Sequence, residues 1–103
     1  MPKDMQQRQQ ALSELVEGNR ITAGMYVRTR GDELILGRLE PVGPQGSTER
    51  DDRVKLTRLG ADTYGISVRR HTGRWEKTPF TGSLEDMFDV VCGVMQHLVA
   101  AYP

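Results

Sequence analysis

The C-terminal segment Ser83–Tyr102, SLEDMFDVVCGVMQHLVAAY, contains the longest apolar periodicity in this chain of 103 residues. At 100° per residue its apolar side chains cover an arc of about 200°, whereas a helix buried on one side needs about 100°. Ser83 is followed three residues later by Asp86, a spacing typical of a helix N-cap. We therefore expect one long helix over residues 83–102 that covers a sheet face and is buried on more than one side.

The segment Met25–Val42, MYVRTRGDELILGRLEPV, predicts a β-hairpin with its two-residue turn beginning at Gly31. This register opposes Tyr26 to Gly37, so that an aromatic ring covers a strand glycine. We also expect a β-bulge at Gly37. The face of this hairpin that is expected to be buried consists of Val27, Thr29, Leu34 and Leu36.

Residues 53–68, RVKLTRLGADTYGISV, predict a second hairpin. A three-residue connection with Asp62 in the left-handed conformation pairs Leu56 with Ile66. The preceding residues 41–52, PVGPQGSTERDD, contain two prolines and two glycines. This composition predicts a long connector without strand structure. A third hairpin follows directly and turns near residue 73. A proline at position 79 indicates that its second strand either is a sheet edge or ends there.

These signals together predict an α+β fold in a single domain, residues 1–103. It begins with an N-terminal helix over residues 4–17 and continues with an antiparallel β-meander of about five strands, three successive hairpins, over residues 25–80. It ends with the helix over residues 83–102. We expect this long C-terminal helix to lie across one sheet face, formed by Val27, Leu36, Val54, Leu56, Ile66 and Val68.

The net charge is zero, but the charges are unevenly distributed along the chain. Residues 50–77 contain eight basic and four acidic side chains, whereas residues 78–103 contain three acidic side chains and no Lys or Arg. The pattern predicts a basic sheet segment and an acidic outer face on the last helix. Acidic groups in the first turn of that helix also complement its dipole.

No apolar run approaches the ~20 residues that a membrane span requires. The N-terminal residues MPKDMQQRQQ lack the apolar region of a signal peptide. Cys92 is the single cysteine, which excludes an intrachain disulfide and fits a reducing compartment. We therefore expect a cytoplasmic protein without a membrane partner, in which Cys92 is a small buried apolar residue.

The sequence contains no catalytic motif that would indicate an enzyme. His71 and His97 have no cysteine or second histidine at a spacing typical of metal ligands. The glycines at positions 43 and 46 lack the Gly-Lys-Ser/Thr sequence of a phosphate-binding loop. We predict no catalytic, cofactor-binding or metal-binding residues and no cofactor. An enzyme would require catalytic residues from a partner or an arrangement that matches no known motif.

The wide apolar arc of the last helix predicts self-association, most simply as a two-fold homodimer. The residues expected at this interface are apolar side chains beyond the area that one sheet face covers. They are Val90, Val94 and Val99 of the helix, and Ile35 and Leu39 of the other sheet face. The main functional hypothesis is accordingly a small binding module whose partner is a second copy or another protein.

The alternative hypothesis is binding of single-stranded nucleic acid through the basic sheet face. Its candidate residues are Arg53, Lys55, Arg69, Arg74, Trp75 and Lys77. Two registers of the third hairpin are compatible with the sequence, and they place Trp75 on opposite faces. If Arg69 pairs with Glu76, Trp75 lies on the core side. If Arg70 pairs with Glu76, Trp75 lies beside Arg69 on the basic face. Burial in the core is the favoured arrangement, because this is the only tryptophan in an aromatic-poor chain.

Overall fold

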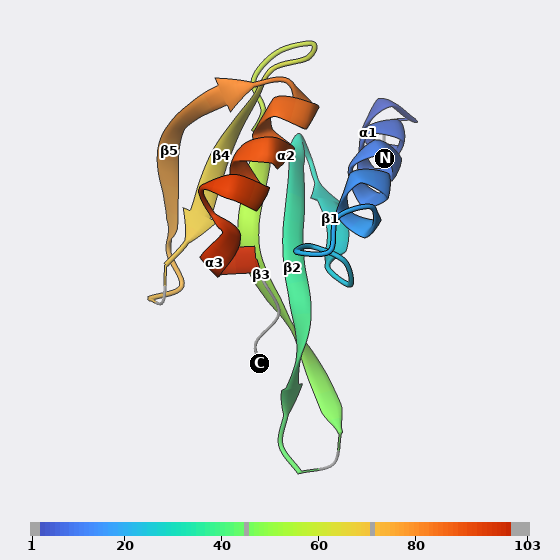
Figure 1. Ribbon diagram of the computed structural model, residues 1–103, viewed down its shortest axis with the longest axis vertical. Coiled ribbons are helices and arrows are strands. Elements are labelled where there is room, and N and C mark those ends of the chain that lie inside the picture. The colour runs from blue at the N-terminus through green and yellow to red at the C-terminus, as the bar shows by residue number, and fades with distance from the viewer. Residues whose placement is uncertain (1–2, 45, 71, 100–103) are drawn as a thin grey trace.

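The computed structural model describes residues 3–44, 46–70 and 72–99 of the chain. Five antiparallel strands form one sheet in the order β1-β2-β3-β4-β5, with α1 beside β1 and with α2 and α3 in front of the middle strands (Figure 1). The α+β class, the N-terminal helix and the five-stranded antiparallel sheet are therefore confirmed. The elements are α1 (Lys3–Glu17), β1 (Tyr26–Arg30), β2 (Glu33–Val42), β3 (Ser47–Arg58), β4 (Tyr64–Arg69), β5 (Trp75–Gly82), α2 (Leu84–Gly93) and α3 (Gln96–Val99).

The registers predicted for the first two hairpins are confirmed. Tyr26 pairs with Gly37 in the first hairpin, and Leu56 pairs with Ile66 in the second. The three-residue connection of the second hairpin is confirmed, because Arg58 pairs with Tyr64 and the Leu59 amide donates to the Thr63 carbonyl at 2.7 Å, which leaves residues 60–62 between them. Only the left-handed conformation predicted for Asp62 is wrong, since no non-glycine residue in the described part of the chain has a positive φ.

The predicted connector over residues 41–52 is wrong, because these residues continue β2 and begin β3. The strands pair as far as Val42 and Ser47 and form an arm, defined here as residues 38–51, that projects from the rest of the molecule (Figure 1). The glycines at positions 43 and 46 both have φ of 74° and lie at the tip, where the chain reverses. The described pairs of β1 end at Gly37, and those of β4 end at Val54, so the arm is two-stranded.

The predicted single helix over residues 83–102 is also wrong, since α2 ends at Gly93 and a separate turn, α3, begins at Gln96. The amide of Met95 donates to the carbonyl of Val90 at 3.3 Å, a wider turn than that of an α-helix. Residues 100–102 of the predicted helix lie outside the described residues. The predicted N-cap is confirmed, because Ser83 Oγ accepts a hydrogen bond from the Asp86 amide at 3.1 Å.

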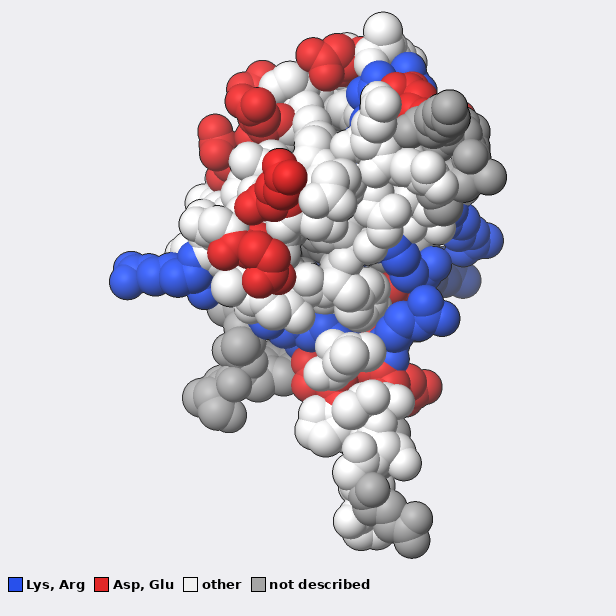
Figure 2. All heavy atoms as spheres, turned by 90° about the vertical axis from the view of Figure 1, so that its right-hand side faces the viewer, with Lys and Arg blue, Asp and Glu red and all other residues white. Residues whose placement is uncertain are grey.

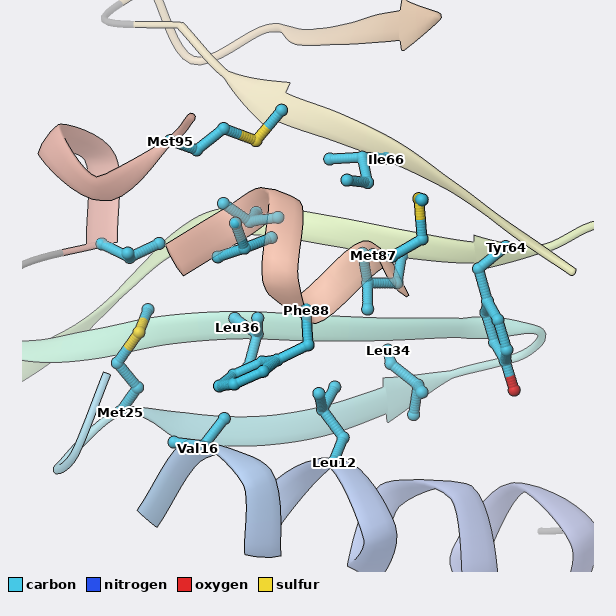
Figure 3. Packing of buried hydrophobic residues seen from close by; sticks show 14 of the residues in the cluster. Leu12, Val16, Met25, Leu34, Leu36, Tyr64, Ile66, Met87, Phe88 and Met95 are labelled. Carbon is cyan, nitrogen blue, oxygen red and sulfur yellow. The ribbon is translucent and has the colours of Figure 1, made fainter. Parts of the chain in front are cut away.

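Apart from Ile35, the buried apolar side chains of the described residues form one cluster that includes residues of the three helices and of the sheet. Figure 3 shows Phe88 pointing from α2 toward Leu36 of β2 and toward Leu12 and Val16 of α1. The break between α2 and α3 gives Met95 a place in the same cluster. The members that are less than one-tenth exposed are Met5, Leu12, Val16, Met25, Leu34, Leu36, Val54, Leu56, Tyr64, Ile66, Val68, Met87, Phe88, Val91, Met95 and Val99.

One buried guanidinium group, that of Arg38, joins three separate segments of the chain. Its Nε donates to the Val99 carbonyl in α3 at 2.8 Å. Its two terminal nitrogens donate to the Ile21 carbonyl at 2.8 Å and to the Ala23 carbonyl at 3.2 Å, both in the loop between α1 and β1. Burial lowers the pKa of Arg38, and the nearby charge of Arg53 lowers it further. Hydrogen bonds to the three carbonyls offset part of the free-energy cost of desolvating this charge.

Replacing Arg38 with Met keeps the aliphatic stem and removes all three donors. We expect the free energy of unfolding to fall by about 3 kcal/mol, because a buried carbonyl left without a partner costs about 1–3 kcal/mol. Urea denaturation followed by circular dichroism measures this difference. The matched control is Arg50→Met, since Arg50 is exposed on the arm. Its effect should stay within about 0.5 kcal/mol. Equal stability of the two variants would contradict the role assigned to Arg38.

Candidate functional site

The face of the sheet opposite the core carries most of its charged side chains. In an antiparallel sheet, directly paired residues point to the same face. The pairs that connect β1 to β5 on this face run through Arg28, Ile35, Lys55, Ser67 and Lys77. Arg69 and Trp75, which pair with each other, share the face because Arg69 lies two residues beyond Ser67. We call this surface the outer face.

Trp75 lies half-buried on the outer face, so the favoured prediction that it is buried in the core is wrong. Its ring centroid lies 4.8 Å from Lys55 Nζ and 5.9 Å from Cζ of Arg69. Both distances are within the ~6 Å over which a cation is attracted to an aromatic ring. The two cations therefore flank the only tryptophan of the chain.

The register of the third hairpin explains the position of Trp75. The Arg70 amide donates to the Arg74 carbonyl at 2.8 Å, so the turn pairs Arg69 with Trp75, which neither predicted register does. Farther from the turn, Gly65 pairs with Thr81, as in the register that opposes Arg70 to Glu76. The register of β4 and β5 therefore changes between these two pairs, at an irregularity between Gly65 and Ser67.

The irregularity lies on the edge strand β5 and contains Pro79. Between the pairs Gly65–Thr81 and Ser67–Lys77, three residues of β5 lie opposite one residue of β4. The Thr78 hydroxyl donates to the Ile66 carbonyl at 2.9 Å and replaces a backbone donor there. A proline has no N–H to contribute to the ladder, so an edge strand is where such a bulge is tolerated.

The structure places four of the six predicted basic-face residues on the outer face and a fifth next to it. Lys55, Arg69, Trp75 and Lys77 lie on that face, and Arg74 is exposed at the adjoining turn. Lys55 is also held by Glu33, whose Oε2 lies 3.1 Å from Lys55 Nζ.

Arg53, the sixth predicted residue, does not lie on the outer face. The register shifts between Leu36 and Gly37, so that Arg53 has no partner of its own in β2. Its guanidinium group donates to the Leu98 carbonyl of α3 at 3.3 Å and forms ion pairs with Glu40 and Asp51. The expected bulge at Gly37 is confirmed, and its effect is to turn this arginine away from Lys55.

The sequence does not predict the cluster of side chains around Asp52, because the composition of residues 41–52 is typical of a connector. The Asp52 carboxylate accepts hydrogen bonds from Tyr26 Oη at 2.5 Å and from Arg28 Nε and Nη2 at 3.1 and 2.5 Å. Arg69 Nη1 lies 3.7 Å from the same carboxylate. Hydrogen bonding from Arg28 holds the pKa of Asp52 below its usual range, although burial opposes this effect.

Tyr26 lies across Gly37, as predicted. A Cβ atom at Gly37 would overlap the Tyr26 phenol and the Asp51 carbonyl, so only glycine fits under the ring. Burial and the bond to Asp52 raise the pKa of the Tyr26 hydroxyl, which therefore stays protonated and donates. On the same face, Ile35 is 1% exposed although it is not part of the core cluster. Long cationic side chains such as its register neighbours cover apolar groups with their stems.

The five residues predicted for self-association are not brought together by the structure. Val99 is fully buried, Ile35 is buried on the outer face, and Val90 is half-buried. Leu39 and Val94 are 59% and 62% exposed, the first on the arm and the second just after α2. Cys92 is half-buried, and burial raises the pKa of its thiol.

Acidic side chains predominate on the α2 side of the molecule. Figure 2 shows them at the upper left, whereas in the lower part of the view acidic and basic side chains lie next to one another. Glu85, Asp86 and Asp89 are exposed on α2. Within the described part of the chain, the exposed cations Arg74 and Lys77 have no carboxylate within 4 Å. These two side chains are therefore available to an external anion.

The described residues contain no group of three or more His, Cys, Asp or Glu side chains that could hold a metal ion. Residues 3–44, 46–70 and 72–99 also contain no helix that is long and apolar enough to cross a membrane. A hollow of about 570 Å³ lies where the arm meets the β4–β5 hairpin, and arginines and acidic residues both line it. His97 lies at this hollow, whereas His71 lies outside the described residues.

The Asp52 cluster predicts a pH-dependent contribution to stability. Because the folded-state pKa of Asp52 is depressed, its stabilisation is present above the unfolded value of ~3.9 and is lost as the pH falls through the folded value. Asp52→Asn should therefore be less stable than the wild type at pH 7, and the difference should shrink below about pH 4. Urea denaturation between pH 7 and pH 3 measures it. Asp62→Asn, in the exposed β3–β4 turn, is the control. A difference for Asp52→Asn that is constant with pH would contradict this assignment.

Comparison of the chain with models of known protein families, with curated proteins and with solved structures gives no match.

Proposed function

We propose that the protein binds single-stranded nucleic acid through the outer face of its sheet. The observation that carries this proposal is the position of Trp75, half-buried on that face with two cations within 6 Å of its ring centroid. An aromatic ring beside phosphate-binding cations is the basic unit of single-strand binding, because every base offers a face for stacking and every nucleotide a charge. Trp75 stacks a base, and Lys55, Arg69 and Lys77 contact the phosphates.

Stacking requires that a base replace a cation at the ring of Trp75. The free energies of the two contacts favour this exchange. A cation over an exposed aromatic ring contributes about 0.5–1 kcal/mol. A base stacked on an aromatic side chain contributes about 1–3 kcal/mol. The displaced ammonium or guanidinium group also gains a phosphate contact, with release of counterions from the nucleic acid. The contacts of Lys55 and Arg69 with Trp75 therefore keep the phosphate-binding groups beside the stacking site in the free protein.

A single strand fits this surface better than a duplex. Reading a duplex requires a helix or a two-stranded ribbon that enters the major groove. The arm is such a ribbon, but Glu40, Glu49 and Asp51 lie on it, and phosphates would repel them. The cations beside Trp75 lie instead on the sheet, where a single strand can place its bases and its backbone side by side.

Self-association stays a prediction of the sequence. The two exposed members of its predicted interface, Leu39 and Val94, lie on different elements. Nucleic-acid binding through the outer face requires neither of them.

Titration of the protein with an octathymidylate tests the proposal through the fluorescence of its only tryptophan. We expect emission from Trp75 to be quenched on binding, because a base stacks on the indole. With three to four phosphate contacts, the logarithm of the affinity should fall with the logarithm of the salt concentration with a slope of about −2 to −3. Between 50 and 200 mM NaCl this slope corresponds to a loss of about 20- to 60-fold in affinity.

Lys77→Gln should reduce the magnitude of the slope by about 0.7, because it removes one phosphate contact. The matched control is Arg20→Gln, an exposed arginine in the loop after α1 and away from the outer face. It should leave both the affinity and the slope unchanged. Emission that does not respond to the octamer at 50 mM salt would refute the proposal.

A further inference from the structure

The outer face holds a second aromatic ring, and a continuous line of contacts joins it to Trp75. Tyr26 donates to Asp52 at 2.5 Å, Asp52 lies 3.7 Å from Arg69, and Cζ of Arg69 lies 5.9 Å from the centre of the Trp75 ring. Tyr26 comes from the edge strand β1 and Trp75 from the opposite edge strand β5. We call this line, which also contains Gly37 under the tyrosine ring, the aromatic strip.

The aromatic strip crosses all five strands at about a right angle. Adjacent strands lie about 4.8 Å apart, so four spacings separate its ends by about 19 Å. A stacked single strand advances about 3.4 Å per nucleotide. An octanucleotide spans about 24 Å when stacked and so reaches both rings. A trinucleotide spans about 7 Å when stacked and cannot reach both.

The centre of the strip contains a carboxylate, but its charge is balanced locally. Arg28 binds Asp52 with two nitrogens, and Arg69 lies next to it. Arg50, whose charge acts on the Tyr26 hydroxyl, has no carboxylate within 4 Å in the described part of the chain. Three arginines therefore line a strip that contains one carboxylate, and a phosphate backbone can follow it without facing an uncompensated negative charge.

The ring of Tyr26 is held in place before any ligand binds. It rests on Gly37, where a Cβ would overlap it, and its hydroxyl is fixed by Asp52. A ring fixed by one face and by its hydroxyl group loses little rotational freedom when a base stacks on it. The aromatic strip thus has a rigid ring at the β1 edge and a cation-flanked ring at the β5 edge.

We propose that a single strand runs across the sheet along the aromatic strip, with one base stacked on Trp75 and another, several nucleotides away, on Tyr26. This inference rests on the proposed function and deepens it, because it gives the site a direction and a minimum length. A long oligonucleotide then stacks on both rings, whereas a short one stacks on one ring only. Tyr26 then determines the preference of the protein for length rather than for sequence.

The test compares the affinities of trithymidylate and octathymidylate for the wild type, Trp75→Leu and Tyr26→Leu. We expect Trp75→Leu to weaken both oligonucleotides, and Tyr26→Leu to weaken the octamer by about 5- to 150-fold while leaving the trimer unchanged. Tyr26→Phe is the matched control, since it keeps the ring and removes only the bond to Asp52. It should bind the octamer within about threefold of the wild type. Octauridylate, measured in parallel, shows whether the site prefers DNA or RNA.

The outcomes separate this inference from the proposed function. If Tyr26→Leu binds the octamer like the wild type while Trp75→Leu does not, the crossing path is wrong and the proposed function stands. If neither oligonucleotide binds the wild type, both are wrong. Should Tyr26→Leu fail to fold, NMR of the wild-type protein decides the question. The Tyr26 ring and the Gly37 amide should shift with the octamer and not with the trimer, and equal shifts with both would overturn the path.

Discussion

The fold depends on one buried cation, the guanidinium group of Arg38, which binds carbonyls of α3 and of the loop that leads into β1. Among the described residues it has no carboxylate within 4 Å, and its three carbonyl partners offset part of the desolvation of the charge. Arg53 donates to the neighbouring Leu98 carbonyl from the adjacent strand. Two arginines of β2 and β3 therefore hold the end of the last helix, where carbonyls lack partners within the helix.

This arrangement also organises the opposite face of the sheet. The register shift between Leu36 and Gly37 brings Arg53 to the α3 side and leaves Asp52 on the outer face, opposite Gly37. Tyr26 covers that glycine and bonds to Asp52. A single bulge thus supplies both an anchor for the last helix and the centre of the aromatic strip. A regular β3 would place Arg53 beside Lys55 and remove the carboxylate that orients Tyr26.

Local signals in the sequence were sufficient to predict the first hairpin and the helix cap at Ser83, because short-range sterics and hydrogen bonds determine both. They were insufficient for the arm, since prolines and glycines at its tip resemble a connector until strand pairing is known. They also misplaced Trp75, because the bulge at Pro79 shifts the register in a way that alternation cannot reveal. Long-range pairing, rather than local preference, decided the candidate site.

The acidic side chains of α2 and the cations around Trp75 lie on different sides of the sheet in this electrically neutral protein, and such an arrangement contributes to a dipole moment. A neutral molecule feels no net force in a uniform field, but its dipole experiences a torque. Near a polyanion, that torque turns the Lys55 and Arg69 side of the sheet inward and the acidic surface of α2 outward before contact. For the nucleic acid proposed as ligand, this torque would favour the binding orientation during the diffusive encounter, without the non-specific adhesion that a high net positive charge would bring.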